Sequence, residues 1–324
     1  MHPKLSVVVP VFNEEKSLPE LHARLRKALA GISHELVYVD DGSADRSVEI
    51  VEGWTRAEEG VTLVQLSRNF GMEIAMSAGI DQSRGDWVVL IHADLQDPPE
   101  LIPQMLEEAL RQQADVVYAR RIGRDESAVK RSLATTFYRM MERLARVPFQ
   151  GQAGDFRLMS RRVVEAVQRM PERRRFLRGM VAWVGFEQVP IEYRRAGRSH
   201  GRGASYPQLF RLAIEALTAY SDVPLSLATI AGTFTAIVSA LGGVLVALLT
   251  LFGVVDVSTQ SFVLLALLFL GGIQLITVGI IGRYLARVHE ESLKRPLYLL
   301  SRVVPARTAS GRELDAPTEP AESR

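Results

Sequence analysis

The chain contains no cysteine. This absence excludes a disulfide framework, a zinc site built from thiolates and a thiol nucleophile. Any chemistry must therefore use oxygen and nitrogen groups. The absence also favours a protein whose folded domain works in a reducing compartment.

A large excess of one charge is also lacking. The 324 residues carry a formal net charge of only +2, and the basic residues form no stripe interleaved with aromatic ones. This argues against nucleic acid as the main partner. The first apolar run, Leu5 to Val9, is ended by Pro10 and is too short for the core of a secretory signal. We therefore expect the N-terminal part to stay on the cytoplasmic side.

Charged residues are missing from two long stretches, residues 223–255 and 257–282. Each exceeds the roughly 20 apolar residues that span a bilayer core. We predict two transmembrane helices in a hairpin over residues 223–284, and the alternative is a pair of buried helices in a soluble protein. Arginine and lysine flank both outer ends and are missing from the connecting turn, so both termini are predicted to face the cytoplasm as parts of a multi-pass inner-membrane protein.

The segments around the hairpin have their own patterns. Residues 205–222 place apolar side chains about one helical period apart, which predicts a juxtamembrane amphipathic helix. Residues 285–324 are predicted to be a cytoplasmic C-terminal segment. From about Pro305 it is rich in Pro, Glu, Ala, Ser and Thr without apolar periodicity, which predicts a disordered tail. Residues 1–204 remain as one cytoplasmic domain.

Within that domain, short β-branched runs alternate with helical patterns as far as about residue 120. This alternation predicts an α/β fold with a mostly parallel sheet, and ligands then bind at the carboxyl ends of the strands. Polar pairs follow four of the expected strands: Asn13 and Glu14, Asp40 and Asp41, Arg68 and Asn69, His92 and Asp94. We expect these pairs to meet in one site. A plain turn with a helix cap is the alternative for Asp41-Gly42-Ser43.

The ordered segments VVVPVFNEE, VDDGSADRS, SRNFG, HADLQDPPE, GDFRLMSRRVV and RFLRGMVAWVGF resemble the family 2 glycosyltransferases, which have the GT-A type nucleotide-sugar-binding fold. With the two C-terminal spans, the resemblance is to the polyprenyl-phosphate branch, which includes dolichol-phosphate mannose synthase and bacterial synthases of undecaprenyl-phosphate sugars. It implies inverting transfer of a sugar from a UDP- or GDP-sugar to a polyprenyl phosphate, and assembly of a homo-oligomer through the transmembrane helices.

The resemblance implies that the donor is bound by Pro10, Asn13, Glu14, Asp40, Asp41, Arg68 and Arg202. Either aspartate after the second strand would accept hydrogen bonds from the base or the ribose. Arg202 lies in a glycine-rich segment where the family commonly has a mobile loop ending in Ser-Lys-Tyr. Ser205 replaces that lysine here, so we expect Arg198 or Arg202 to substitute for it. A flexible connector to the membrane is the alternative for this segment.

A departing diphosphate needs its charge offset, usually by a divalent cation. The family uses Asp-x-Asp, but this chain has His92, Asp94 and Gln96, so the first carboxylate is missing. Mg²⁺ and Mn²⁺ prefer oxygen ligands. We expect Asp94, Gln96 and the donor to hold the ion, with His92 touching the ion or the ribose. A hydrogen-bonded structural histidine is the alternative.

Asp155 matches the family's carboxylate beside the acceptor and is, with Asp94, our predicted catalytic residue. A phosphate monoester has a second pKa of about 6, so it is largely deprotonated at neutral pH. We therefore expect Asp155 mainly to orient the acceptor and to take up any residual proton. Arg121 and Arg131 resemble the family's acceptor-phosphate arginines.

Two other classes of function compete with this interpretation. A processive or protein-directed transferase usually carries a Gln-x-x-Arg-Trp signature, which this chain lacks. A non-catalytic membrane subunit with a degenerate transferase domain is compatible with His92 and Ser205 at positions where the family has aspartate and lysine.

Overall fold

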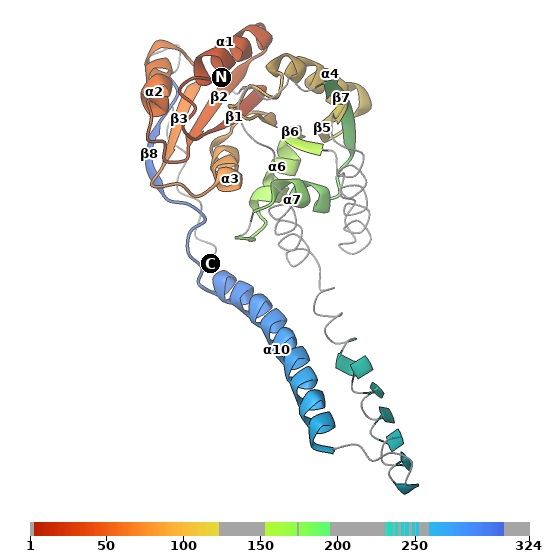
Figure 1. Cartoon of the computed structure of the whole chain (residues 1–324). Coiled ribbons are helices and arrows are strands. Elements are labelled where there is room, and N and C mark those ends of the chain that lie inside the picture. The colour runs from red at the N-terminus through yellow and green to blue at the C-terminus, as the bar shows by residue number, and fades with distance from the viewer. Residues whose placement is uncertain are drawn as a thin grey trace. The chain divides into compact units, whose positions relative to one another are not determined.

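The computed structural model describes residues 3–122, 153–173, 175–194 and 259–307, together with short stretches between 230 and 252. The described residues fall into two units (Figure 1). The first, here called the sheet unit, contains the described residues up to 194 and residues 295–307. The second, here called the helical unit, contains the described residues from 230 to 294.

The sheet unit is built on an eight-stranded sheet with the order β7-β5-β6-β4-β1-β2-β3-β8. Four of its strand pairs are parallel (β1–β2, β2–β3, β1–β4 and β5–β7), which confirms the predicted mostly parallel sheet. β6 runs antiparallel to β4 and β5, and β8 runs antiparallel to β3. The strands are β1 (Leu5–Val11), β2 (His34–Asp40), β3 (Val61–Leu66), β4 (Trp87–Leu90), β5 (Val116–Ile122), β6 (Ala153–Ser160), β7 (Gln188–Arg194) and β8 (Leu300–Val304).

Helices cover both faces of this sheet (Figure 1). One face packs against α1 (Leu18–Ala28), α2 (Ser47–Ala57) and α4 (Ile102–Gln112), which follows a short 3₁₀ turn at Pro99–Leu101. The other face packs against α3 (Met72–Gln82), α6 (Arg161–Gln168) and α7 (Leu177–Trp183). Because both faces are covered, the central strand β1 is buried along its whole length.

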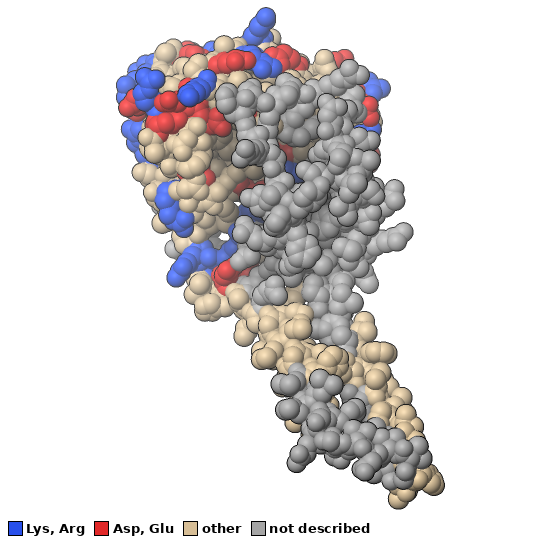
Figure 2. Space-filling model, in the orientation of Figure 1, with Lys and Arg blue, Asp and Glu red and all other residues tan. Residues whose placement is uncertain are grey.

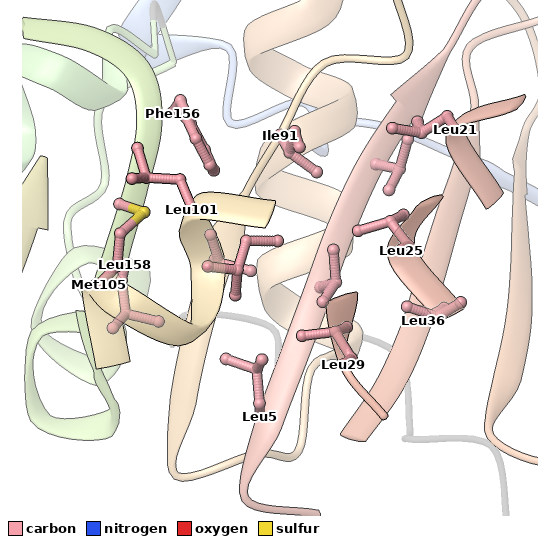
Figure 3. Packing of buried hydrophobic residues seen from close by; sticks show 14 of the residues in the cluster. Leu5, Leu21, Leu25, Leu29, Leu36, Ile91, Leu101, Met105, Phe156 and Leu158 are labelled. Carbon is pink, nitrogen blue, oxygen red and sulfur yellow. The ribbon is translucent and has the colours of Figure 1, made fainter. Parts of the chain in front are cut away.

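The face under α1 and α4 forms a continuous apolar core. Figure 3 shows leucines of α1, among them Leu21 and Leu25, directed at the strands, with Phe156 and Ile91 further along the same cluster. Leu21, Leu25 and Phe156 have no exposed surface. Burying a side chain of this size stabilises the fold by roughly 1.5–3 kcal/mol. This core fixes the carboxyl ends of β1, β2 and β4 relative to one another.

On the opposite face α3 approaches the sheet unusually closely. A Cβ added at Gly79 would lie 2.2 Å from Cγ1 of Val8 and 3.0 Å from Cγ2 of Val39. Glycine therefore allows the helix backbone to rest against the valines of β1 and β2. The close contact holds the first turn of α3 over the carboxyl ends of the strands.

The segment after residue 294 returns to the sheet unit, which the sequence analysis did not foresee. β8 pairs with β3 and forms the edge of the sheet, and the Tyr298 hydroxyl donates a hydrogen bond of 2.9 Å to Asp81 at the end of α3. Ala306 is buried, and the backbone of Arg307 forms an isolated parallel β-bridge with the backbone of Glu59. The predicted disordered tail therefore does not begin at Pro305; residues 308–324 lie outside the described residues.

The helical unit contains α10 (Thr259–Ser292), a helix of 34 residues. Among the described residues, its part Phe269–Ser292 is the one helical stretch long and apolar enough to cross a membrane. Its large apolar side chains are exposed, Leu275 by 75 %, and the described atoms of this unit in Figure 2 are largely uncharged. The predicted first span lies mostly outside the described residues, so the two-helix hairpin stays a prediction. The predicted juxtamembrane helix at 205–222 also lies outside them.

Candidate active site

A pocket of about 390 Å³ opens at the carboxyl ends of β1, β2 and β4. This is the edge where a sheet of this topology binds ligands. Six of the residues predicted for the site line it, namely Pro10, Glu14, Asp41, Asn69, His92 and Asp94. The remaining lining residues are Val11, Phe12, Gly71, Met72, Ala75 and Ala93. The structure thus brings together residues that the sequence separates by more than 80 positions.

Asn13 and Asp40 brace the loops beside this pocket. Asn13, with φ of 57°, accepts a hydrogen bond from the Ala44 amide at 2.8 Å, and its own amide donates to Oγ of Ser43 at 3.0 Å. One oxygen of Asp40 accepts from the Ser43 amide at 3.1 Å. Its second oxygen is buried and has no hydrogen-bond partner among the described residues. An unpaired buried carboxylate oxygen is costly, so this atom is a candidate acceptor for a ligand.

Asp41 holds the loop between β3 and α3. Its carboxylate accepts hydrogen bonds from the amides of Phe70 at 2.7 Å and Gly71 at 2.9 Å. Burial raises the pKa of Asp41 above its ordinary value, although these two amides oppose the shift. Gly42 has φ of +77°, and a Cβ there would lie 2.8 Å from the backbone nitrogen of Asn69. Glycine therefore permits the loops after β2 and β3 to touch.

Arg68 lies beside the pocket and is not among its lining residues. Its guanidinium carbon lies 4.0 Å from the centre of the Phe70 ring, and Nη1 donates to the Asn69 carbonyl at 2.8 Å. These contacts hold the side chain against its own loop.

A tight turn follows β4 and carries the three residues predicted to meet a cation. The Asp94 carboxylate accepts a hydrogen bond from the Gln96 amide at 3.1 Å. Leu95, between them, has φ of +60°, a left-handed conformation that is costly for a branched side chain. Among the described residues, no group of three or more His, Asp or Glu side chains is arranged to hold a metal ion. Asp94 and Gln96 offer hard oxygen ligands, which fit Mg²⁺ or Mn²⁺ only if phosphates and water supply the rest.

Asp155 sits on β6 opposite His92 and is buried. Its carboxylate accepts hydrogen bonds from Nε of Arg178 at 2.5 Å and from Nη2 at 2.6 Å, and lies 3.3 Å from Nε2 of His92. Burial alone would raise the pKa of Asp155, but the bonds from His92 and Arg178 outweigh it and hold that pKa far below its usual range. Burial likewise opposes protonation of His92, yet the contact with Asp155 raises its pKa overall. Asp155 is therefore ionised at neutral pH.

Two more charged residues lie behind this group. Arg157 is fully buried, burial lowers its pKa to about 10, and its Nη2 donates to the Gly154 carbonyl at 3.0 Å. Glu73 of α3 accepts a hydrogen bond from the Leu177 amide at 3.0 Å. Burial and the nearby Asp155 charge raise the pKa of Glu73. Glu73 therefore links α3 to α7 through the Leu177 amide, and its charge interacts with Asp155 of β6.

Arg178, Arg157 and Glu73 were not predicted from the sequence. Arg178 lies within RFLRGMVAWVGF and Arg157 within GDFRLMS, and an arginine inside an otherwise apolar run was the available signal. No such signal distinguished Glu73, which looks like an ordinary acidic residue in the first turn of a helix.

Three predicted site residues cannot be placed with the others. Arg131 and Arg202 lie outside the described residues. Arg121 is described by its backbone in β5, where it pairs with Tyr193 of β7. The acceptor-phosphate site and the loop over the donor therefore stay predictions.

The sheet topology and the pocket at its carboxyl edge define a GT-A type nucleotide-sugar-binding domain. Residues 6–168 match the model of glycosyl transferase family 2, and this chain belongs to that family. It is 41 % identical over 302 residues to an uncharacterized glycosyltransferase of Synechocystis, covering 92 % of this chain and 95 % of that protein. It is 38 % identical over 301 residues to the bactoprenol glucosyl transferase of Shigella phage SfV, covering 92 % and 98 %.

Solved structures with a similar arrangement are more distant. Glucosyl-3-phosphoglycerate synthase from Mycobacterium tuberculosis, solved with Mn²⁺, UDP and phosphoglyceric acid, is 19 % identical with a TM-score of 0.49. The similarity covers 67 % of this chain and 76 % of that one. TarS residues 1–349 from S. aureus, solved with UDP-GlcNAc, are 19 % identical with a TM-score of 0.44, covering 67 % and 66 %.

Proposed function

We propose that this glycosyltransferase moves a sugar from a UDP- or GDP-sugar to the phosphate of a polyprenyl lipid, with inversion at the anomeric carbon. The proposal is carried by its likeness to bactoprenol glucosyl transferases, which extends over 92 % of the chain and so includes the apolar helix α10 as well as the sheet unit. The product would be a lipid-linked sugar for cell-envelope glycan or lipid modification.

The nucleotide of the donor occupies the pocket between the loops after β1, β2 and β3. The unpaired oxygen of Asp40 suits an N–H of uracil or guanine, or a ribose hydroxyl. Asp41 contributes indirectly by holding the loop between β3 and α3, because its carboxylate already accepts hydrogen bonds from the amides of Phe70 and Gly71. Pro10, Glu14 and Asn69 form the walls around the nucleotide.

Asp94 and Gln96 hold a divalent cation, Mg²⁺ or Mn²⁺, together with the donor diphosphate. When bound, the cation offsets the charge that develops on the leaving nucleotide. Because His92 is engaged with Asp155, its contribution is to hold that carboxylate beside the pocket, which His92 itself lines. This assignment differs from the expectation that His92 touches the ion or the ribose.

On the acceptor side, Asp155 orients the side chains of Arg178 and His92 and does not abstract a proton. A carboxylate whose pKa is held this low is a poor base, and a lipid phosphate is already largely ionised at neutral pH. Asp155 instead fixes the guanidinium of Arg178 and the imidazole of His92. With Arg121 and Arg131, the Arg178 guanidinium would seat an anionic phosphate close to the donor.

The connectivity of the sheet supports a membrane hairpin. β7, which precedes the apolar region, and β8, which follows it, are strands of one sheet. A chain that leaves after β7 must return to the same side of a membrane before β8, so the number of crossings is even. If α10 is one crossing, a second lies between residues 195 and 258, where the sequence predicts it. Because arginine and lysine flank both outer ends of the apolar region, the side proposed for the sheet unit and both termini is the cytoplasm.

The proposal is tested by sugar transfer in membranes from cells that overproduce the full chain. Radiolabelled UDP- and GDP-sugars are supplied with Mg²⁺ or Mn²⁺, and label is counted in the butanol-extractable lipid. We expect label from one donor class, and its loss in membranes that carry Asp94→Asn at the same protein level. Absence of lipid-linked label with every common donor would favour the rival function, a non-catalytic membrane subunit.

A further inference from the structure

We propose that Tyr193 is a positioning residue of the active site, because its hydroxyl fixes the turn that presents Asp94 and Gln96 to the cation. The inference rests on the proposed function, since it assigns Tyr193 a task in binding the metal and the donor diphosphate. Tyr193 itself touches neither of them.

The contact that carries the inference joins distant parts of the chain. The Tyr193 hydroxyl on β7 donates a hydrogen bond of 2.5 Å to the carboxylate of Asp97. Both side chains are buried, with 6 % of Tyr193 and 3 % of Asp97 exposed. A hydrogen bond to a buried charged acceptor is among the stronger ones, and a buried acceptor that loses its donor is costly.

Asp97 is the anchor of a turn that would not hold its shape alone. The turn contains Leu95 in the left-handed conformation and is closed at one end by the bond from the Gln96 amide to Asp94. A non-glycine residue persists in that conformation only when its surroundings enforce it. Asp97 follows Gln96 directly, so its bond to Tyr193 fixes the other end. Releasing Asp97 lets Leu95 relax and moves the oxygens of Asp94 and Gln96 apart.

The position of Tyr193 also explains why the site needs this particular side chain. Its ring packs edge-on against the ring of Phe156, with the two ring centres 6.3 Å apart, and Phe156 follows Asp155 on β6. On β7, Tyr193 is the register partner of Arg121 of β5. One residue thus touches the strand that carries Asp155, lies beside the strand that carries Arg121, and fixes the cation-binding turn. It sets the distance between the donor side and the acceptor side of the site.

The test uses Tyr193→Phe in the full chain in detergent, because this change keeps the ring and removes only the hydroxyl. Tyr118→Phe on the neighbouring strand β5 is the matched control, since Tyr118 is also buried and makes no contact with the turn among those described. Binding of Mn²⁺ in the presence of UDP is measured by the electron paramagnetic resonance signal of free Mn²⁺. Unfolding temperatures and the kinetics of sugar transfer are measured in parallel.

We expect Tyr193→Phe to weaken Mn²⁺ binding about tenfold, the equivalent of one hydrogen bond to a charged group. The Mn²⁺ concentration for half-maximal transfer should rise by the same factor, while the KM for the lipid acceptor stays unchanged. Asp97→Asn, which keeps an oxygen acceptor for the Tyr193 hydroxyl, should fall between wild type and Tyr193→Phe. Tyr118→Phe should bind Mn²⁺ as the wild type does.

Equal Mn²⁺ affinity in wild type and Tyr193→Phe would overturn the inference. It would also be overturned if Tyr193→Phe weakened Mn²⁺, UDP and lipid binding alike together with a lowered unfolding temperature, because that pattern is a general structural defect. A different result would contradict the proposed function alone. If the wild-type chain binds Mn²⁺ and UDP but transfers no label to lipid, the polyprenyl phosphate is not the acceptor, while the positioning role of Tyr193 still holds.

Discussion

At the scale of single residues, the most informative arrangement is one buried carboxylate held by an arginine and a histidine. Asp155 is engaged by Arg178 through two hydrogen bonds and approached by His92 at 3.3 Å. In the pattern that the sequence resembles, position 92 is a carboxylate, which would here face Asp155 with a like charge. Histidine removes that repulsion and contacts Asp155 instead, so the departure from Asp-x-Asp is compatible with a working site.

Asp155→Asn should reduce sugar transfer about a hundredfold, because the loss of one partner from a buried charge pair costs about 3 kcal/mol. The loss should be the same from pH 6 to pH 9, because the pKa of Asp155 lies far below this range and its ionisation does not change. The measurement is kcat/KM for the lipid acceptor as a function of pH. A penalty that shrinks at high pH would instead indicate that Asp155 accepts a proton.

The residues of the site were only partly visible in the sequence. Pro10, Glu14, Asp41, His92 and Asp94 were found because each follows or ends a β-branched run, and the carboxyl ends of parallel strands meet. Arg178 was missed because it comes from a helix on the far side of Asp155, and no period in the sequence relates the two. Its role depends on tertiary packing that local patterns do not encode.

At the scale of elements, most of the strands that the sequence predicted are apolar and buried. β1, β2 and β4 are buried nearly throughout, whereas β7 is an edge strand in which Pro190 and Glu192 are exposed while Val189 and Tyr193 are buried. β6 was missed because Asp155 and Arg157 interrupt its apolar pattern, and β8 because it is a short edge strand after the membrane region. α3 is apolar around most of its surface and so lacks the helical period that reveals a surface helix.

The close packing of α3 against the sheet can be tested by substitution of Gly79. Gly79→Ala should destabilise the sheet unit by about 1–3 kcal/mol, since overpacking forces the helix away from Val8 and Val39. The matched control is Gly53→Ala in α2, where an added Cβ meets nothing within 4 Å. The control should be neutral or stabilising by up to about 1 kcal/mol, because alanine favours a helix interior. Urea unfolding in detergent measures both, and equal effects would contradict the packing argument.

Asp155 also links elements, since it joins β6 to α7 and to the end of β4. Its pKa is lowered on folding, so the stability it contributes is present above its ordinary value of 3.8 and is lost as the pH falls through and below that value. Wild type should therefore lose more stability than Asp155→Asn between pH 5 and pH 3, measured by urea midpoints. Glu192→Gln, which removes an exposed ion pair with Arg120, is the control and should follow the wild type.

At the scale of the whole molecule, the apolar region is an insertion within the sheet unit rather than an appendage after it. β8 completes the sheet on β3 after α10 has ended, and Tyr298 ties the returning chain to Asp81. A single terminal anchor would leave the domain free to rotate about one connection. In the proposed membrane topology, two connections would restrict that freedom and so raise the effective concentration of a lipid-borne acceptor.

The absence of cysteine makes the predicted topology directly testable, because any introduced cysteine is the only thiol. Ser258→Cys lies two residues after Asp256, which separates the two charge-free stretches, and Ser301→Cys lies at an exposed position of β8. An impermeant maleimide should label the first variant in spheroplasts and the second only after lysis, because an even number of crossings returns β8 to the cytoplasm. Labelling of Ser301→Cys in intact spheroplasts would place β8 outside. That result would contradict the proposed topology, because β8 belongs to the same sheet as β1 to β7 and must lie on the same side of the membrane.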